Sequence, residues 1–156
     1  MHFLKFCFIL LFSVQLFADT IDLNQIAKEA SKDKKTVLIF FHTLACPYCN
    51  KMLAESFEGK KEQDIINQKF YFVDINLDSK DKVIYKKFKG TVNQFADLFH
   101  VQFYPTILFM EDNVVLMNLK GYRNKSKFET ILKYISSKSY ESMDLETFAV
   151  ELEMKE

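Results

Sequence analysis

Two cysteines separated by two residues are the side chains of this sequence best suited to chemistry. Cys46 and Cys49 enclose Pro47 and Tyr48 in the segment CPYC. A disulfide across so short a ring removes little conformational entropy from the unfolded chain, so it would stabilise the fold only slightly. Two thiols at this spacing can instead exchange with another disulfide, because one thiolate attacks and the other sulfur resolves the mixed disulfide. We predict that Cys46 and Cys49 form a redox-active disulfide and that the protein uses no other cofactor.

The helix expected after the first cysteine gives the two sulfurs different roles. Pro47 suits the first turn of a helix, and Cys49 and Met52 fall on its apolar face. Cys46 then lies at the helix N-terminus, where unpaired backbone N–H groups and the helix dipole favour a thiolate. Shielding on the apolar face keeps the Cys49 thiol protonated until a mixed disulfide forms. We predict that Cys46 attacks and that Cys49 resolves.

Segments with strand and helix patterns alternate around this pair and predict an α/β fold. The continuous apolar run Thr36–Phe41 is typical of a strand covered on both faces, and strand–helix–strand order favours parallel pairing. The charged segment 78–90 is predicted as an inserted loop or a small hairpin. Helices are expected over 21–31, 47–58, 61–68, 92–99 and 128–135, and strands over 36–41, 70–76, 106–110 and 114–119. The last two strands form an antiparallel pair, so we expect a mixed sheet flanked by helices.

The first 18 residues have the pattern of a secretory signal peptide, which predicts a periplasmic protein. Lys5 precedes the apolar run Phe6–Phe12, which is shorter than the roughly 20 residues of a membrane-spanning helix, and Ala18 offers a cleavage site. The large Leu16 leaves an uncleaved N-terminal anchor as the alternative. Cys7 would leave with the signal, so the mature chain would keep two cysteines.

The remaining chain divides into an expected domain over 19–138 and an acidic extension over 139–156. The 156 residues suffice for one apolar core, and we expect a monomer. The 21 basic and 21 acidic residues balance, which excludes a general electrostatic affinity for nucleic acid. Leu145, Phe148 and Leu152 recur at helical spacing in the extension. We expect a helix folded back on the domain, with a partner-docking helix as the alternative.

Three motifs in order resemble the thioredoxin superfamily over residues 21–137. They are CPYC after a buried strand, Tyr104-Pro105-Thr106 before the next core strand, and a closing hairpin that ends at Gly121. Within the superfamily the chain is most similar to exported bacterial thioredoxin-related proteins. The resemblance implies a thioredoxin fold in which the Tyr104–Pro105 bond is cis and lies against Cys46. An ordinary trans proline at the start of a strand is the alternative.

The resemblance also implies where a substrate binds, and it exposes one departure from the family. The backbone of Tyr104 is expected to pair with a substrate strand, and Pro105, Pro47 and Tyr48 complete the predicted substrate-binding set. Many thioredoxins carry a buried carboxylate six positions before the first cysteine, where this chain has Phe40. His42 is the nearest titratable side chain, but a hydrogen-bonded structural role is the expectation for it. We therefore leave His42 out of the predicted catalytic set.

The function implied is that of an exported thiol:disulfide oxidoreductase that reduces other exported proteins containing cysteines. A reductant outside the cytoplasm needs recharging, so a membrane thiol electron donor is expected. A disulfide-introducing oxidase or isomerase of the same fold, or a non-catalytic thioredoxin-like binding module, is the alternative. Zinc held by both cysteines with His42 and His100 is a third possibility, but their spacing fits no compact zinc module, so we predict no metal.

Overall fold

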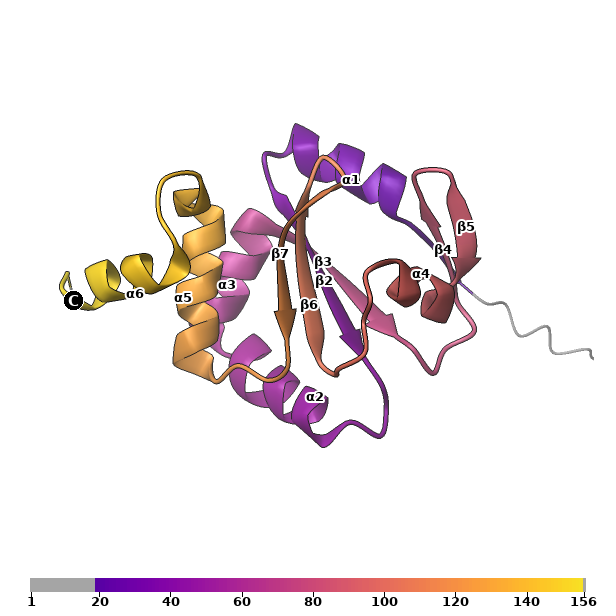
Figure 1. Ribbon diagram of the computed structural model, residues 1–156, viewed down its shortest axis with the longest axis horizontal. Helices are drawn as coiled ribbons and strands as arrows, with labels where there is room; N and C mark the ends of the chain where they lie inside the picture. The colour runs from indigo at the N-terminus through magenta and orange to yellow at the C-terminus, as the bar shows by residue number, and fades with distance from the viewer. Residues whose placement is uncertain (1–18, 156) are drawn as a thin grey trace, which may run out of the picture.

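The computed structural model describes residues 19–155, which fold around a four-stranded mixed sheet (Figure 1). Its strand order is β3-β2-β6-β7. β2 runs parallel to β3 and antiparallel to β6, and β6 pairs antiparallel with β7. These strands are β2 Thr36–His42, β3 Phe70–Asn76, β6 Thr106–Glu111 and β7 Val114–Lys120. The predicted α/β architecture with a mixed sheet is confirmed.

Helices cover both faces of this sheet. They are α1 Leu23–Lys32, α2 Pro47–Met52, α3 Lys60–Lys69, α4 Val92–Leu98, α5 Lys125–Ser136 and α6 Leu145–Glu153. A π-helical turn, Leu53–Phe57, continues α2, and the short 3₁₀ turn Ser139–Glu141 follows α5. In Figure 1, α3 and α5 lie on one side of the sheet and α4 on the other.

Strand β2 fills two separate cores because successive side chains of a strand point to opposite faces. Ile39 and Phe41 pack in the core formed with α1 and α4. Leu38 and Phe40 pack in the other core, which contains Met52 of α2 and Phe128 of α5. All seven residues of β2 are buried, as the continuous apolar run predicted.

A second sheet corrects one expectation about the start of the domain. β1 Thr20–Asp22 pairs parallel with β4 Lys82–Tyr85, and β4 pairs antiparallel with β5 Phe88–Thr91. The predicted hairpin is therefore present. Ile21, which the sequence placed in the opening helix, lies in β1 because its partner is Val83. Helix α1 begins after Asp22, whose carboxylate accepts the backbone N–H groups of Asn24 and Gln25.

The C-terminal extension packs against the domain through its first helical turns. The rings of Phe148 in α6 and Tyr134 in α5 lie 5.3 Å apart, which confirms a helix folded back on the domain. The far end of α6 projects away from α5 in Figure 1. None of the helices within residues 19–155 combines the length and apolarity needed to cross a membrane. The predicted signal peptide, residues 1–18, lies outside the described residues.

Candidate active site

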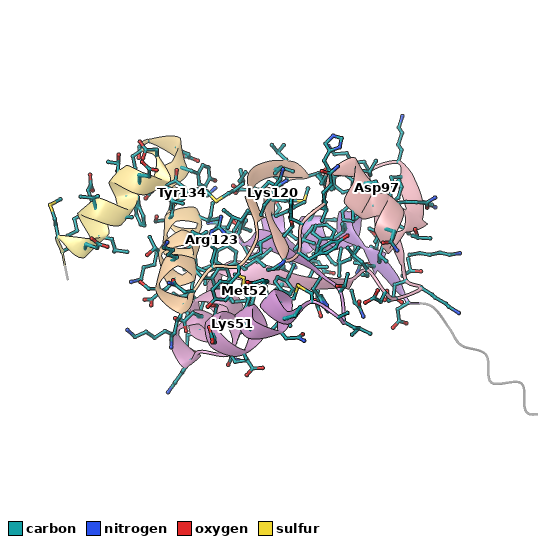
Figure 2. All side chains as sticks on the ribbon, turned by 60° about the horizontal axis from the view of Figure 1, so that its bottom comes forward. Lys51, Met52, Asp97, Lys120, Arg123 and Tyr134 are labelled. Atoms are coloured by element: carbon teal, nitrogen blue, oxygen red, sulfur yellow. A yellow bond between two sulfur atoms is a disulfide. The ribbon has the colours of Figure 1, made fainter. Side chains whose placement is uncertain are left out.

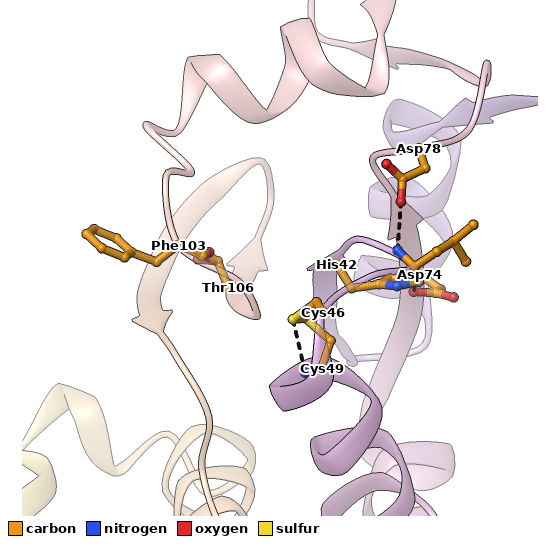
Figure 3. Close-up of a disulfide and its surroundings, with 8 residues drawn as sticks. His42, Cys46, Cys49, Asp74, Asp78, Phe103 and Thr106 are labelled. Atoms are coloured by element: carbon orange, nitrogen blue, oxygen red, sulfur yellow. Dashed lines mark hydrogen bonds and ion pairs between the residues drawn. A yellow bond between two sulfur atoms is a disulfide. The ribbon is translucent and has the colours of Figure 1, made fainter.

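Cys46 and Cys49 are joined in a disulfide with a sulfur–sulfur distance of 2.03 Å (Figure 3). Cys46 is the N-cap residue of α2, and its Sγ accepts the backbone N–H of Cys49 at 3.1 Å. Pro47 occupies the first turn, where its missing N–H removes no helical hydrogen bond. The predicted position of Cys46 at a helix N-terminus is confirmed.

The two sulfurs differ in their access to solvent. Cys46 is 9% exposed, whereas Cys49 is fully buried. Both belong to the core that contains Phe40, Met52 and Phe57. An incoming disulfide can therefore approach Cys46 while Cys49 stays inside the protein, which agrees with an attacking and a resolving sulfur.

The register of the central strands positions Pro105 at the same end of the sheet. Thr106 at the start of β6 pairs with Phe41 near the end of β2, so Pro105 lies beside the point where the chain turns toward Cys46. The Tyr104–Pro105 bond is cis, as the resemblance implied. The Thr106 hydroxyl donates to the Phe103 carbonyl at 2.7 Å, which holds the turn before Pro105. Pro105 is buried and Tyr104 is partly exposed beside it.

The loop between β2 and α2 is held by a residue that sequence reasoning missed. The carboxylate of Asp78, just after β3, accepts the backbone N–H of Leu44 at 2.7 Å. This bond fixes the segment that leads into Cys46 (Figure 3). No sequence pattern indicated it, because the two residues are 34 positions apart.

A small polar and aromatic network supports Tyr48 between the cysteines. Tyr48 is 63% exposed, and its ring lies 6.3 Å from the ring of Tyr122. The Tyr122 hydroxyl donates to Glu55 on the π-helical turn at 2.6 Å, and this hydrogen bond raises the pKa of Tyr122. Lys51 Nζ lies 5.1 Å from the centre of the Tyr122 ring. These contacts link Tyr48 to the π-helical turn through Tyr122 and Glu55. Of these residues, the sequence indicated only Tyr48 as part of the site.

Comparison with known proteins assigns the family. The profile of the thioredoxin-like domain matches residues 23–136. The chain belongs to the thioredoxin-like family. The match ends at the last residue of α5, so α6 of this thioredoxin-like protein lies beyond it.

Solved structures share the thioredoxin-like fold at low sequence identity. A thioredoxin-fold protein from Helicobacter pylori is 24% identical with a TM-score of 0.61, covering 78% of this chain and 82% of that one. A thioredoxin from Thermus thermophilus is 17% identical with a TM-score of 0.57, and the match covers 76% of this chain and 86% of that one. The oxidised C-terminal domain of DsbD from Neisseria meningitidis is 14% identical with a TM-score of 0.53, and the match covers 74% of this chain and 97% of that one.

The family and the site together define the class of chemistry. A thioredoxin-like domain that carries a Cys-x-x-Cys disulfide at the N-terminus of a helix is a thiol:disulfide oxidoreductase. Within residues 19–155, no group of three or more histidine, cysteine or acidic side chains is arranged to hold a metal ion. In the oxidised state the two sulfurs are bonded to each other, so neither is a free thiolate ligand.

Proposed function

We propose that this protein is an exported reductase that reduces the disulfides of other exported, cysteine-containing proteins. The observation that carries thiol–disulfide exchange at Cys46 is the hydrogen bond from the Cys49 N–H to Cys46 Sγ at the start of α2. The reducing direction rests on Pro47 and Tyr48, which add no positive charge beside Cys46 to stabilise the reduced form further. Hydrogen bonds and the positive end of a helix stabilise a thiolate, so the reduced protein would hold Cys46 ready to attack.

The exchange requires two steps at these sulfurs. The Cys46 thiolate attacks a client disulfide, a mixed disulfide forms, and one client sulfur leaves as a thiolate. Cys49 then attacks Cys46, the internal disulfide forms, and the second client sulfur leaves. Two electrons pass from the centre to the client.

Clients would bind at the exposed surface around Cys46. Leu44, Tyr48 and Tyr104 expose apolar surface on the segments that flank the disulfide. Tyr104 precedes the buried Pro105 just before the start of β6, where its backbone would pair with an extended client segment. We propose Pro47, Tyr48, Tyr104 and Pro105 as the client-binding residues.

The proposals that the protein is exported and that a donor reduces its disulfide again after each turnover are based on the sequence. Residues 1–18 have the pattern of a signal peptide, and the chain that follows contains Cys46 and Cys49 as its two cysteines. A reductase in the periplasm consumes electrons that this compartment does not regenerate. A membrane thiol electron donor is therefore the proposed redox partner, and the protein is proposed to act as a monomer.

The reduction potential of the Cys46–Cys49 couple tests the direction of electron flow. Pro47 and Tyr48 are the pair typical of glutaredoxins, and neither adds a positive charge beside Cys46. We expect a potential of about −200 to −230 mV, well below the roughly −120 mV of a strong oxidant. Equilibration with glutathione at defined ratios, followed by alkylation of free thiols, measures it.

The redox state in cells provides the second arm of this test. If a membrane donor keeps reducing the protein, most molecules in acid-quenched cells should have Cys46 and Cys49 as free thiols. A potential above about −150 mV, with a centre trapped fully oxidised, would assign the protein to the disulfide-introducing oxidases instead.

A further inference from the structure

The charges of this protein balance overall but are separated along the molecule. The β4–β5 hairpin, residues 82–91, contains four lysines and no acidic residue, a formal charge of +4. Helix α6 with its N-cap, residues 144–153, contains four acidic residues and no basic one, a formal charge of −4. The hairpin and α6 lie at opposite ends of the long axis in Figure 1. Figure 2 agrees, with Tyr134 toward α6 and Asp97 of α4 toward the hairpin.

The lysines of the hairpin are available to an outside partner. All four are exposed, and within residues 19–155 none of them forms an ion pair. Two acidic side chains that lie near the hairpin in this sheet are engaged elsewhere. Asp22 accepts two backbone N–H groups at the start of α1, and Asp81 accepts the backbone N–H of Asp19 at 3.0 Å.

One face of the hairpin contains a hollow with a volume of about 420 Å³. Lys82 pairs with Thr91 and Ile84 pairs with Lys89, and residues two apart on a strand share a face. These four side chains therefore lie on the hollowed face, and all four line the hollow. Of the described residues that line it, the charged ones are Lys82 and Lys89. The hollow is thus suited to an anionic group.

Uncharged donors complete the lining of the hollow. The Thr91 hydroxyl oxygen accepts the Gln94 backbone N–H at 3.3 Å, and the Gln94 side-chain oxygen accepts the Thr91 backbone N–H at 3.0 Å. This exchange uses the acceptor atoms of both side chains and leaves their O–H and NH₂ hydrogens free. Phosphate oxygens accept hydrogen bonds from ammonium, hydroxyl and amide donors.

The chain enters the domain at this basic end. Strand β1 pairs with β4, and the Lys82 backbone N–H donates to the Asp19 carbonyl at 2.9 Å. Asp19 directly follows residues 1–18, whose sequence pattern predicts a signal peptide or, as the alternative, an uncleaved anchor. The end of the domain that faces a bilayer during export or anchoring is therefore the end that carries the lysines.

The residue types of the hairpin favour a lipid surface over a protein partner. Lysine is a compact, hydrated charge on a flexible stem, which suits headgroups that move within a bilayer. Protein interfaces are instead enriched in arginine and aromatic residues and depleted in lysine. An anionic surface would attract the hairpin and repel α6, so the charge separation would also orient the molecule.

We propose that the β4–β5 hairpin binds the anionic surface of a bilayer, with lipid phosphates at the hollow between Lys82 and Lys89. Helix α2, whose N-cap is Cys46, lies between the two ends of the molecule in Figure 1, so the disulfide stays uncovered. The inference adds to the proposed function a position beside the membrane donor. The test of lipid binding does not depend on the exchange reaction.

Vesicle binding by the full chain tests the proposal. Affinity is compared between vesicles of phosphatidylcholine and vesicles that also contain phosphatidylglycerol. The apolar run in residues 6–12 contributes to both, so the ratio of the two affinities reports the effect of charge. Because each lysine near an anionic surface strengthens binding about fivefold, Lys82→Gln with Lys89→Gln should lower this ratio about 25-fold. The wild-type ratio should also fall as the salt concentration rises.

The matched control is Lys60→Gln with Lys61→Gln, at the start of α3. Both lysines are exposed, so the control removes the same charge as the hairpin variant. Charges more than about 10 Å from the bilayer are screened at about 0.1 M salt, so the ratio should change less than about twofold. An equal loss in the two double variants would show binding by net charge and would overturn the role of the hairpin.

Acetylation of lysines followed by mass spectrometry locates the contact. Vesicles with phosphatidylglycerol should protect Lys82 and Lys89 and leave Lys60 and Lys61 reactive. Glycerol phosphate offers the same phosphate chemistry without a bilayer, and at the same phosphate concentration it should protect neither pair. Equal protection of Lys82 and Lys89 by glycerol phosphate would assign the hollow to a soluble anion and overturn the lipid assignment.

The remaining outcomes separate this inference from the proposed function. A wild-type chain without preference for anionic vesicles would overturn the inference, and an acidic protein or the α6 end of a second copy would then be the partner of the hairpin. The Lys82→Gln and Lys89→Gln double variant should reduce an insulin-type disulfide at the wild-type rate. A wild-type chain that failed to reduce that substrate would overturn the proposed function and leave the lipid binding untouched.

Discussion

Cys46 and Cys49 lie within one turn of the same helix, yet the structure gives them different environments. Cys46 receives a backbone N–H at its sulfur and reaches the surface, while Cys49 is enclosed by the core around Phe40 and Met52. A sulfur held by an N–H donor reacts as a thiolate, and a buried sulfur remains a thiol until an electrophile approaches it. The order of the two reactions is therefore set by position on the helix.

Single cysteine variants test this order. We expect Cys46→Ser to abolish reduction of an insulin-type disulfide substrate, because no accessible thiolate remains. Cys49→Ser should still attack but fail to resolve, so mixed disulfides with clients should accumulate. Non-reducing electrophoresis followed by mass analysis detects them. Capture of clients by Cys46→Ser with none by Cys49→Ser would reverse the assignment.

The end of strand β6 is tied to the C-terminal extension by one carboxylate. Glu111 accepts hydrogen bonds from Lys138 Nζ at 2.6 Å and from the Tyr140 hydroxyl at 3.0 Å. The Lys138 contact holds the pKa of Glu111 below its usual range. A carboxyl with a lowered pKa contributes stability above its ordinary pKa, and this contribution is lost as the pH falls through the lowered value. The attachment of the extension should therefore weaken in acid.

Glu111→Gln tests this attachment. Because both partners are partly exposed, we expect a loss of only about 0.5 to 1 kcal/mol in unfolding free energy at pH 7. The difference from wild type should narrow as the pH falls below the ordinary glutamate pKa, and it should close once the pH passes the lowered pKa of Glu111. Urea unfolding at several pH values measures it. The exposed Glu58→Gln serves as control, and a difference that persisted in acid would contradict the role of the ion pair.

At the scale of the whole molecule, β2 couples two cores that contain different helices. Its alternate residues fill the core with α1 and α4 on one face and the core with α2, α3 and α5 on the other. Phe95 and Phe128 are fully buried on opposite sides of this shared strand. Because both cores include β2, a loss of packing in one core should destabilise β2 and thereby the other core as well.

Phe95→Ala and Phe128→Ala test this coupling. Each should lower the unfolding free energy by about 3 to 5 kcal/mol, the range for truncating a buried phenylalanine. Both variants should still unfold in one transition, because β2 cannot be lost from one core alone. Urea unfolding followed by both far-UV and near-UV circular dichroism measures this. Non-coincident curves in either variant would show that the two cores unfold separately.

The sequence by itself determined the features that depend on neighbouring residues. The run Thr36–Phe41 predicts a buried strand, and the residues after Pro47 predict a helix. The CPYC segment predicts a redox-active cysteine pair. Residue type and periodicity encode such features locally, so the cysteines, the central strands and the cis-proline turn were predicted with the family resemblance. Ile21 was misassigned because its neighbours have helical spacing while its strand partner, Val83, lies far along the chain.

Only the tertiary structure decided which distant side chains meet at the site. Tyr122 and Glu55 are 67 positions apart, and Leu44 and Asp78 are 34 apart, so no local pattern relates them. His42 meets Asp74 because β2 and β3 pair in a register that brings their ends together. Strand register and helix packing are set by the burial of the apolar faces of the sheet and the helices. Each apolar face is fully buried only when all the elements that pack on it are in place.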